Sequence, residues 1–198
     1  MTHQRCKALP QDGRYASPWP TSVRLRTFLW RVVWCVLFRT TPKPLNGWRL
    51  LLLRLFGARI SGRPFVAAGS FVTMPWQFEM HDRACLAPGA EVYNLGPVRL
   101  EHDCTIAQQV YLCGGTHDVD DPNLPLVVGE IIVGPHVFIG ARAFVMPGVH
   151  IAEGAVIGAC SVVTRDVPEY AVCAGNPCRV LRGRRRLDAA PPTEAPDA

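Results

Sequence analysis

His117 stands in a segment whose residue types suit proton transfer. The stretch GGTHDVDDPNLP, residues 114–125, surrounds it with three aspartates and two prolines. An imidazole, whose unperturbed pKa is about 6.5, can take up and return a proton near neutral pH. A side chain in this role typically accelerates a reaction about 10²- to 10⁴-fold. The alternative is an ordinary histidine in a surface loop, and the elements that hold the segment must decide between the two.

The other residues that could bind a metal are scattered. The eight cysteines form no C-x-x-C pair and show no zinc spacing; they stand at positions 6, 35, 85, 104, 113, 160, 173 and 178. We expect reduced cysteines that behave as small hydrophobic residues, with a disulfide scaffold as the alternative. We expect no metal and solvated histidines at His3, His81, His102, His136 and His150. The sequence has no GxxxxGK[ST] loop, so nucleotide hydrolysis is not supported.

Aliphatic side chains return every six residues on both sides of His117. Fifteen positions carry this period, interrupted by two short slips and by the segment around His117: Ile60, Val66, Val72, Met80, Leu86, Val92, Leu100, Ile106, Leu112, Val133, Ile139, Val145, Ile151, Ile157 and Val163. A helix has a period of about 3.6 residues and a strand one of about 2, so neither explains six. A stack of triangular coils does, because each coil uses three six-residue sides and points each aliphatic residue inward. The sequence predicts about five such coils over residues 59–181.

One interruption is much longer than a slip. After Leu112 the next inward position would be Asp118, but the period returns only at Val133, so a loop over residues 113–131 leaves the stack. Long loops in compact folds are usually functional, and a rigid stack holds a residue at the base of a loop in fixed geometry. This context favours a catalytic His117 over a surface histidine.

Residues 21–58 are predicted to form two short α-helices. Apolar residues recur at helical spacing in the first, and Arg24 and Arg31 occupy another face; the apolar residues are Leu25, Phe28, Leu29, Val32 and Val36. The second helix has Asn46 as a candidate N-cap and Gly57 as its stop. The uncharged runs are far shorter than the roughly 20 residues that span a bilayer. The pair would either lie on a membrane surface or cap the main domain, and the sequence leaves both open.

The two ends of the chain are basic and its body is acidic. Residues 1–59 carry eleven Lys/Arg and one acidic residue, Asp12, whereas residues 60–178 carry five basic and twelve acidic residues. Such asymmetry suits a membrane surface or an anionic ligand, unless the basic arm packs on the acidic body. We expect residues 1–20 to be loosely ordered and residues 182–198 to form a basic, then Pro/Ala-rich tail.

The periodic region resembles the hexapeptide-repeat acyltransferases, whose fold is a left-handed parallel β-helix. The segment VGPHVFIGARAFVMPGVHIAEGAVIGACSVVTRDVPEYAVCAGNPCRVLR is similar to the end of the maltose, galactoside and nodulation acetyltransferases. The stretches PKPLNGWRLLLLRLFGA, EVYNLGPVRL and GTHD most resemble the acetyltransferases of colanic-acid and exopolysaccharide synthesis. The left hand comes from this resemblance and not from the period.

The resemblance implies a direct acetyl transfer from acetyl-CoA to a sugar hydroxyl, with His117 as the general base. Asp118, Asp120 and Glu130 are candidates for orienting its ring. The resemblance also implies a CoA site with these residues: Ala141, Ala159, Thr164, Arg165, Arg179 and Arg182. Small residues let the pantetheine arm lie against the backbone, and arginines suit its phosphates.

The acceptor and the assembly are implied less sharply. Asn94 in YNLG is a candidate sugar contact, with an ordinary turn asparagine as the alternative. Relatives form closed trimers with sites between subunits, so we expect a cytoplasmic homotrimer, with peripheral membrane contact through the N-terminal helices as an option. Two rival functions remain. One is a non-catalytic scaffold. The other is a zinc enzyme like the γ-class carbonic anhydrases, which need two histidines five residues apart, whereas Pro122 stands five residues after His117.

Overall fold

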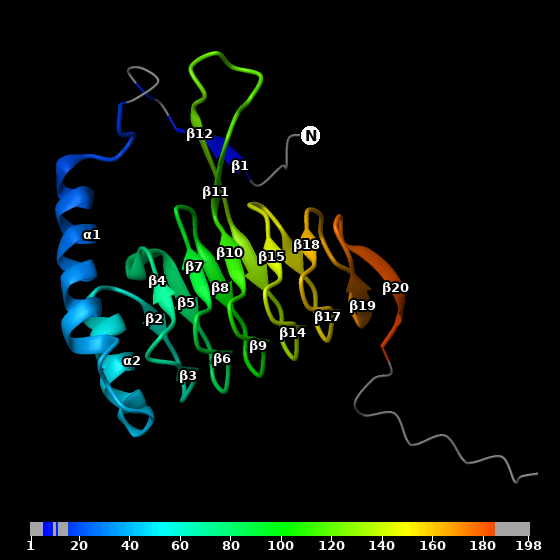
Figure 1. Ribbon diagram of the computed structural model, residues 1–198, viewed down its shortest axis with the longest axis horizontal. Coiled ribbons are helices and arrows are strands. Elements are labelled where there is room, and N and C mark those ends of the chain that lie inside the picture. Colours follow the sequence, from blue (N-terminus) through cyan, green and yellow to red (C-terminus); the bar gives the residue numbers. More distant parts are fainter. Residues whose placement is uncertain (1–5, 10, 12–15, 185–198) are drawn as a thin grey trace, which may run out of the picture.

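The computed structural model describes residues 6–9, 11 and 16–184 of the 198-residue chain. Most of them form a parallel β-helix whose coils follow one another along the long axis of the molecule (Figure 1). Each coil has three sides, and five successive coils each give one short strand to each side. The predicted fold class, a β-helix of about five coils preceded by two helices, is confirmed.

Three parallel sheets form the sides of this prism. The first side contains β2 (Arg59–Ile60), β5 (Phe78–Met80), β8 (Val98–Leu100), β13 (Ile131–Val133) and β16 (His150–Ile151). The second contains β3 (Phe65–Val66), β6 (Cys85–Leu86), β9 (Thr105–Ile106), β14 (Phe138–Ile139) and β17 (Val156–Ile157), and then β19 (Ala171–Ala174) and the antiparallel β20 (Arg179–Gly183). The third contains β4 (Phe71–Val72), β7 (Glu91–Tyr93), β10 (Tyr111–Cys113), β15 (Phe144–Val145) and β18 (Val162–Val163).

The six-residue period becomes three columns of stacked aliphatic side chains. On the third side, for example, Val72 is paired with Val92, Val92 with Leu112 and Leu112 with Val145, and Val145 with Val163. These five side chains are buried. Each coil therefore covers the apolar residues of its neighbours, which is how a solenoid builds a core from short repeats.

Both slips and the long insertion lie at the same corner, between the third and first sides. The slips include the 3-10 helix η3 (Pro75–Gln77) and the turn between β7 and β8. The insertion after β10 forms a hairpin of β11 (Gly115–His117) and β12 (Leu126–Gly129), which rises from the stack (Figure 1). On the far edge of β12, β1 (Cys6–Ala8) adds a third strand. The interpretation of residues 1–20 as loosely ordered did not include this strand.

The N-terminal helices cover the first coil. They are α1 (Thr21–Val33), which continues as the π-helix η1 (Trp34–Phe38), and α2 (Asn46–Leu55), which follows the 3-10 helix η2 (Lys43–Leu45). Trp30 is fully buried, and its Nε1 donates to the Val72 carbonyl at 2.6 Å. Trp34 Nε1 donates to the Ser70 carbonyl at 2.8 Å. The capping interpretation of these helices is thus confirmed for the side that carries the tryptophans.

The expected start of α2 is different in the structure, whereas its end is as expected. Asn46 is the first helical residue and caps no helix; its amide instead bonds the Pro64 carbonyl and the Val66 N–H, both at 2.9 Å. The side-chain amide therefore makes the two hydrogen bonds that the backbone of an adjacent strand would make, and it holds α2 on the first coil. At the other end Gly57 has a φ of 95°, a left-handed conformation that favours glycine and stops a helix.

Candidate active site

The base of the β11–β12 hairpin is packed against the β-helix at two positions where only glycine fits. A Cβ on Gly114 would lie 2.9 Å from the Tyr93 carbonyl oxygen, and one on Gly129 would lie 2.5 Å from the Gly148 nitrogen. Both distances are below any ordinary carbon contact, so side chains here would push the hairpin away. The chain therefore leaves the rigid stack and rejoins it with its backbone in direct contact, which fixes the position of the hairpin.

His117 is the last residue of β11 and is exposed. Its Nδ1 lies 2.7 Å from the carbonyl oxygen of Leu124. A carbonyl oxygen can only accept, so Nδ1 carries the proton and Nε2 of the neutral ring keeps its lone pair. The described residues offer Nε2 no hydrogen-bond partner. The ring is thus held in the tautomer that a general base requires.

The group that orients His117 was not among the three acidic candidates. The carboxylate of Asp118 accepts a hydrogen bond from the N–H of Asp120. The imidazole of His117 instead donates to the backbone carbonyl of Leu124. Neither Asp120 nor Glu130 forms a hydrogen bond to the imidazole. A backbone carbonyl leaves no trace in residue types, so the sequence carried no signal for this partner.

The six residues expected at the CoA site lie on the last two coils and on β20. Ala141 and Ala159 occupy the corner between the second and third sides in successive coils, where the N–H of Cys160 donates to the Ala141 carbonyl at 2.9 Å. A Cβ on Gly140 would lie 2.6 Å from the Ala159 nitrogen, so the two turns are in backbone contact. Small residues thus continue from coil to coil along this edge.

The AGNPCRV motif continues the same edge. The turn of this motif contains a cis peptide bond between Asn176 and Pro177. It is attached to the fifth coil by a hydrogen bond of 2.8 Å from the N–H of Cys178 to the Val162 carbonyl. Arg179 then pairs with Ala174 at the start of β20 and is exposed, while Arg182 lies opposite Val172, further along the strand. Thr164 and the exposed Arg165 follow β18 at the corner from which, two coils earlier, the hairpin leaves.

Asn94, the candidate sugar contact, is fully buried. Its Oδ1 accepts from the N–H of Met74 at 2.8 Å, and its Nδ2 donates to the Met74 carbonyl at 2.7 Å. Both ends of the amide are therefore used to tie two coils together at the slipped corner. This geometry supports the alternative, a structural asparagine, and leaves the side chain unable to face an acceptor.

Among the described residues, the other histidines and the cysteines show no second reactive centre; His3 lies outside the described residues. Ligating atoms of His102, Asp103 and His136 lie within 4.8 Å of one another, but Arg83 already occupies both oxygens of Asp103 at 2.6 and 2.7 Å. That cluster is an ion-pair network, and among the described residues His117 belongs to no such group. All eight cysteines are free thiols, and burial raises the pKa of Cys113, four residues before His117. A poised thiolate nucleophile is therefore not available beside the imidazole.

Within one chain, His117 and the edge that contains Ala141 and Ala159 lie at different corners of the prism. Among the described residues, no hydrogen bond or ion pair connects His117 with any of the six CoA candidates. Between them lies the outer surface of the third side, where the rings of Tyr111 and Phe144 stack with centroids 5.1 Å apart. Burial raises the pKa of Tyr111 to about 12, so its hydroxyl stays protonated and is no candidate base.

Comparisons with known proteins agree with this architecture. Residues 130–165 match the family described as bacterial transferase hexapeptide (six repeats). The chain is 34% identical over 160 residues to the putative colanic acid biosynthesis acetyltransferase WcaF of Escherichia coli (strain K12), covering 81% of this chain and 88% of the relative.

Solved structures of similar fold include a maltose O-acetyltransferase from Clostridium difficile 630, with 22% identity, a TM-score of 0.74 and coverage of 84% of this chain and 90% of the other. A hexapeptide-repeat acetyltransferase from Vibrio cholerae O1 biovar eltor, complexed with acetyl coenzyme A, has 18% identity, a TM-score of 0.74 and coverage of 84% and 89%. At these identities the structures establish the shared fold. The 34% identity to the colanic acid type of acetyltransferase extends over most of both chains. With the shared fold, it shows that this chain belongs to the hexapeptide-repeat acetyltransferase family.

Proposed function

We propose that the protein transfers an acetyl group from acetyl-CoA directly to a sugar hydroxyl during the synthesis of an exopolysaccharide or another cell-surface glycan. The observation that carries the proposal is the tautomer of His117. Its Nδ1–H is donated to Leu124, so the lone pair of Nε2 is available to an incoming hydroxyl. The family relationship and the name of the 34% identical relative support the choice of acetyl donor and of glycan chemistry.

In the proposed reaction the acetyl group passes directly from CoA to the acceptor, without an acyl-enzyme. Nε2 of His117 takes the proton of the acceptor hydroxyl while its oxygen attacks the thioester carbonyl carbon. The C–S bond then breaks, and the imidazolium returns the proton to the departing thiolate, so that an acetyl ester and free CoA leave. The raised pKa of Cys113 supports direct transfer over a thiol-bound intermediate.

CoA is proposed to lie along the edge formed by Ala141 and Ala159 and to end at the arginines. The neighbouring Gly140 and Gly158 leave little side-chain bulk on this edge, which suits the pantetheine arm. Arg179 and Arg182 are exposed and suit the phosphates. Thr164 and Arg165 complete the proposed set.

The separation of His117 from this edge supports an assembly in which neighbouring chains share each site. We therefore propose a homotrimer in which one subunit supplies His117 and the next supplies the CoA groove. Acetyl-CoA is an intracellular metabolite, so the proposed location is the cytoplasm. Peripheral contact with the membrane through the N-terminal helices belongs to the same proposal.

A screen of hydroxyl acceptors tests the function. Purified protein is incubated with acetyl-CoA and candidate sugars, including nucleotide sugars and lipid-linked oligosaccharides, and the release of free thiol is measured. We expect acceptor-dependent thiol release that disappears in His117→Ala. Acetyl-CoA that remains intact with every acceptor, while the protein still binds CoA, would favour the rival function, a non-catalytic scaffold.

A further inference from the structure

Helix α1 is apolar on two opposite sides, although only one side is covered. Trp30 and, in the continuation η1, Phe38 are buried against the first coil and α2. The opposite side presents Phe28 with 63% of its surface exposed, and three further apolar side chains are also exposed: Leu25, Leu29 and Val32. The apolar side of a helix normally packs against another apolar surface, so this second, uncovered side is a candidate contact surface.

The exposed apolar surface continues onto the neighbouring elements. Trp48 of α2 donates its Nε1–H to the Leu37 carbonyl at 2.9 Å, which ties α2 to η1. Ten of the fourteen large exposed hydrophobic residues in the described part of the chain lie on α1, η1, η2 and α2, and we call this set the outer helical face: Leu25, Phe28, Leu29, Val32, Val36, Leu37, Leu45, Trp48, Leu51 and Leu55. Single exposed apolar residues need no explanation, but such a concentration marks an interaction surface.

The helices that carry the outer helical face contain only positive charges, while Glu91 of β7 lies beside Arg31. No acidic residue occurs between Asp12 and Glu79 in the sequence. The basic residues that flank the apolar side chains are exposed: Arg24, Arg31, Arg39, Lys43 and Arg54. An isologous contact with a second copy would bring these like charges together. An anionic partner is therefore favoured over another copy of the chain.

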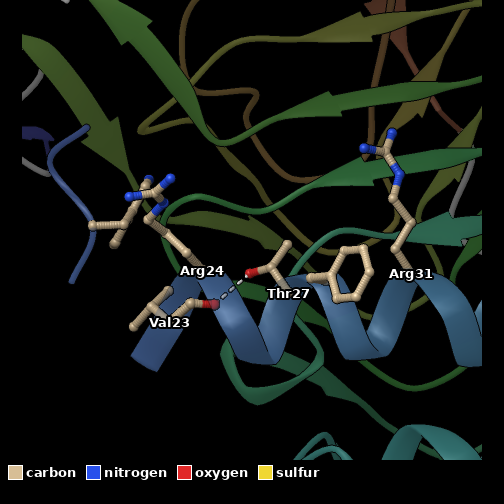
Figure 2. A pocket seen from close by; sticks show the side chains of 6 residues that line it. Val23, Arg24, Thr27 and Arg31 are labelled. Carbon is tan, nitrogen blue, oxygen red and sulfur yellow. Dashed lines mark hydrogen bonds between the residues drawn. The ribbon is translucent and has the colours of Figure 1, made fainter. Parts of the chain in front are cut away.

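Two of these arginines border a recess beside the apolar surface. The recess holds about 290 Å³ and is lined by Trp19, Val23, Arg24, Thr27, Phe28 and Arg31. Figure 2 shows the guanidinium groups of Arg24 and Arg31 extending from the same side of α1, with Thr27 between them along the helix. Neither arginine forms a hydrogen bond or an ion pair with the described residues. Burial raises the pKa of Glu91 on β7, and the charge of Arg31 opposes that shift, so Arg31 has one anionic neighbour in the described part of the chain and Arg24 has none of this kind. Guanidinium groups placed in this way are suited to phosphate oxygens.

We propose that the outer helical face lies on the surface of an anionic lipid bilayer, with Arg24 and Arg31 binding lipid phosphate groups. An apolar stripe with arginines along its edge is typical of helices that lie in the membrane interface. None of the described helices is long and apolar enough to cross a bilayer. The inference deepens the membrane contact named under the proposed function. It would bring the transferase to acceptors carried on lipids.

Vesicle co-sedimentation of the full chain, without acetyl-CoA, tests the inference. Vesicles of phosphatidylglycerol and phosphatidylcholine are compared with vesicles of phosphatidylcholine alone, and we expect strong binding only to the anionic mixture. Phe28→Ser should weaken this binding about tenfold, because an apolar ring no longer enters the interface. Phe138→Ser is the matched control: Phe138 is also exposed but lies on β14, and its loss should leave binding unchanged.

A second pair of variants tests the charges. The double variant Arg24→Gln, Arg31→Gln should bind the anionic vesicles about 25-fold more weakly, about fivefold for each arginine. Its binding should also depend less on salt, because fewer charges contribute. Arg83→Gln removes an exposed charge at a distant corner and should have no effect on binding.

Three results would overturn the inference: no binding of the wild type to anionic vesicles, equal binding of wild type and Phe28→Ser, or equal binding of wild type and the double arginine variant. If the wild type does not bind vesicles and Phe28→Ser changes the oligomeric state in size-exclusion chromatography, the face is an interface between copies. His117→Ala should bind vesicles like the wild type. Loss of acetyl transfer with intact vesicle binding would therefore count against the proposed function alone.

Discussion

At the scale of single residues, the hairpin has a strained backbone conformation at Leu124, the residue that orients His117. Leu124, whose carbonyl holds Nδ1, has a φ of 48°, in the left-handed region that costs a non-glycine residue about 1–2 kcal/mol. The same loop also fixes itself with hydrogen bonds from Leu124 and Asn123 to Asp121. Strain of this kind persists only where surrounding contacts determine it, and it often marks a functional site.

The first prediction concerns His117 itself. We expect His117→Ala to lower kcat about 10²- to 10⁴-fold and to leave CoA affinity nearly unchanged, because a general base acts mainly in the transition state. Steady-state kinetics with acetyl-CoA and the acceptor found by the screen, together with a CoA binding isotherm, measure both quantities. An effect confined to KM would contradict the assignment of His117 as the base.

The residue scale also shows what sequence alone can and cannot predict about the site. His117 was identifiable because its motif interrupts a strict period. Its partner at Leu124 was not, because the contact uses a backbone atom. Residue type and motif make Asn94 a candidate sugar contact, but its amide bonds the Met74 backbone, a pairing that depends on how the slips of two coils align. The type of a residue indicates which chemistry its side chain can do, whereas the stacking of the coils decides whether that side chain is accessible.

At the scale of elements, charged side chains join successive coils at the corner between the first and second sides. Arg83 and Asp103, in consecutive coils, both adopt left-handed φ angles of 55° and 59° and form a two-bond ion pair. His102 adds a hydrogen bond to Asp103 at 2.9 Å. Arg83, by hydrogen bond and charge, and His102 hold the pKa of Asp103 well below its ordinary value of 3.8.

The second prediction follows from that lowered pKa. A carboxyl group whose folded pKa is depressed contributes stability above its unfolded pKa and loses it as pH falls toward the folded value. We expect wild type to have a higher Tm than Asp103→Asn at pH 7, and the difference to shrink as pH falls below about 4. Thermal melts from pH 7 to pH 2 measure this. A difference that stays constant over the range would rule out the ionised pair as its source.

The third prediction concerns the element that closes the first coil. Arg49 of α2 is fully buried and donates to the Val66 carbonyl at 2.7 Å, to the Thr41 hydroxyl and the Pro42 carbonyl at 2.9 Å, and to the Lys43 carbonyl at 3.0 Å. Arg49→Leu leaves these acceptors without a donor, so we expect a loss of about 3 kcal/mol in the free energy of unfolding.

Arg49→Lys should not restore stability, because an ammonium group is a compact donor without the planar fork of arginine. Urea denaturation of the wild type and both variants measures the loss, and Arg54→Leu, which alters an exposed arginine of the same helix, is the matched control. A destabilisation of Arg49→Leu no larger than that of Arg54→Leu would show that the buried network contributes little.

Elements differ in how far their sequence predicts their environment. The coils were predictable because inward residues such as Val92 and Leu112 repeat at one fixed spacing and pair with each other in register. The helices were predictable as helices, but not in orientation. In α1 both the Trp30 side and the Phe28 side are apolar, so the hydrophobic period alone cannot select the side that faces the stack. Packing against the first coil makes that selection.

At the scale of the whole molecule, a prism of five coils places the two parts of the proposed site at different corners. His117 leaves from the third coil at one corner, whereas Ala141 and Ala159 occupy another corner in the fourth and fifth coils. A rigid solenoid cannot fold back on itself to close that gap. A second chain, placed beside the first, can supply the missing half, and this is the reason that the proposed site is shared in a trimer. In a closed trimer of parallel prisms, the three outer helical faces would also lie at the same end, where they would reinforce the proposed membrane binding.

The last prediction tests whether each site is shared. Two inactive variants are used: His117→Ala, which lacks the base, and Ala141→Trp, which places a large ring in the proposed groove. They are unfolded together in equal amounts and refolded, so that trimers form by random mixing. A working interface needs an intact histidine from one side and an intact groove from the other, each with a chance of one half. About a quarter of the sites should then recover activity.

If one chain supplied the whole site, no mixed trimer would contain an intact one, and activity would stay at background. Size-exclusion chromatography of each variant alone establishes that both fold and assemble, and differently tagged chains confirm the mixing. Background activity in confirmed mixed trimers would refute the shared site, because every other condition for recovery would have been met.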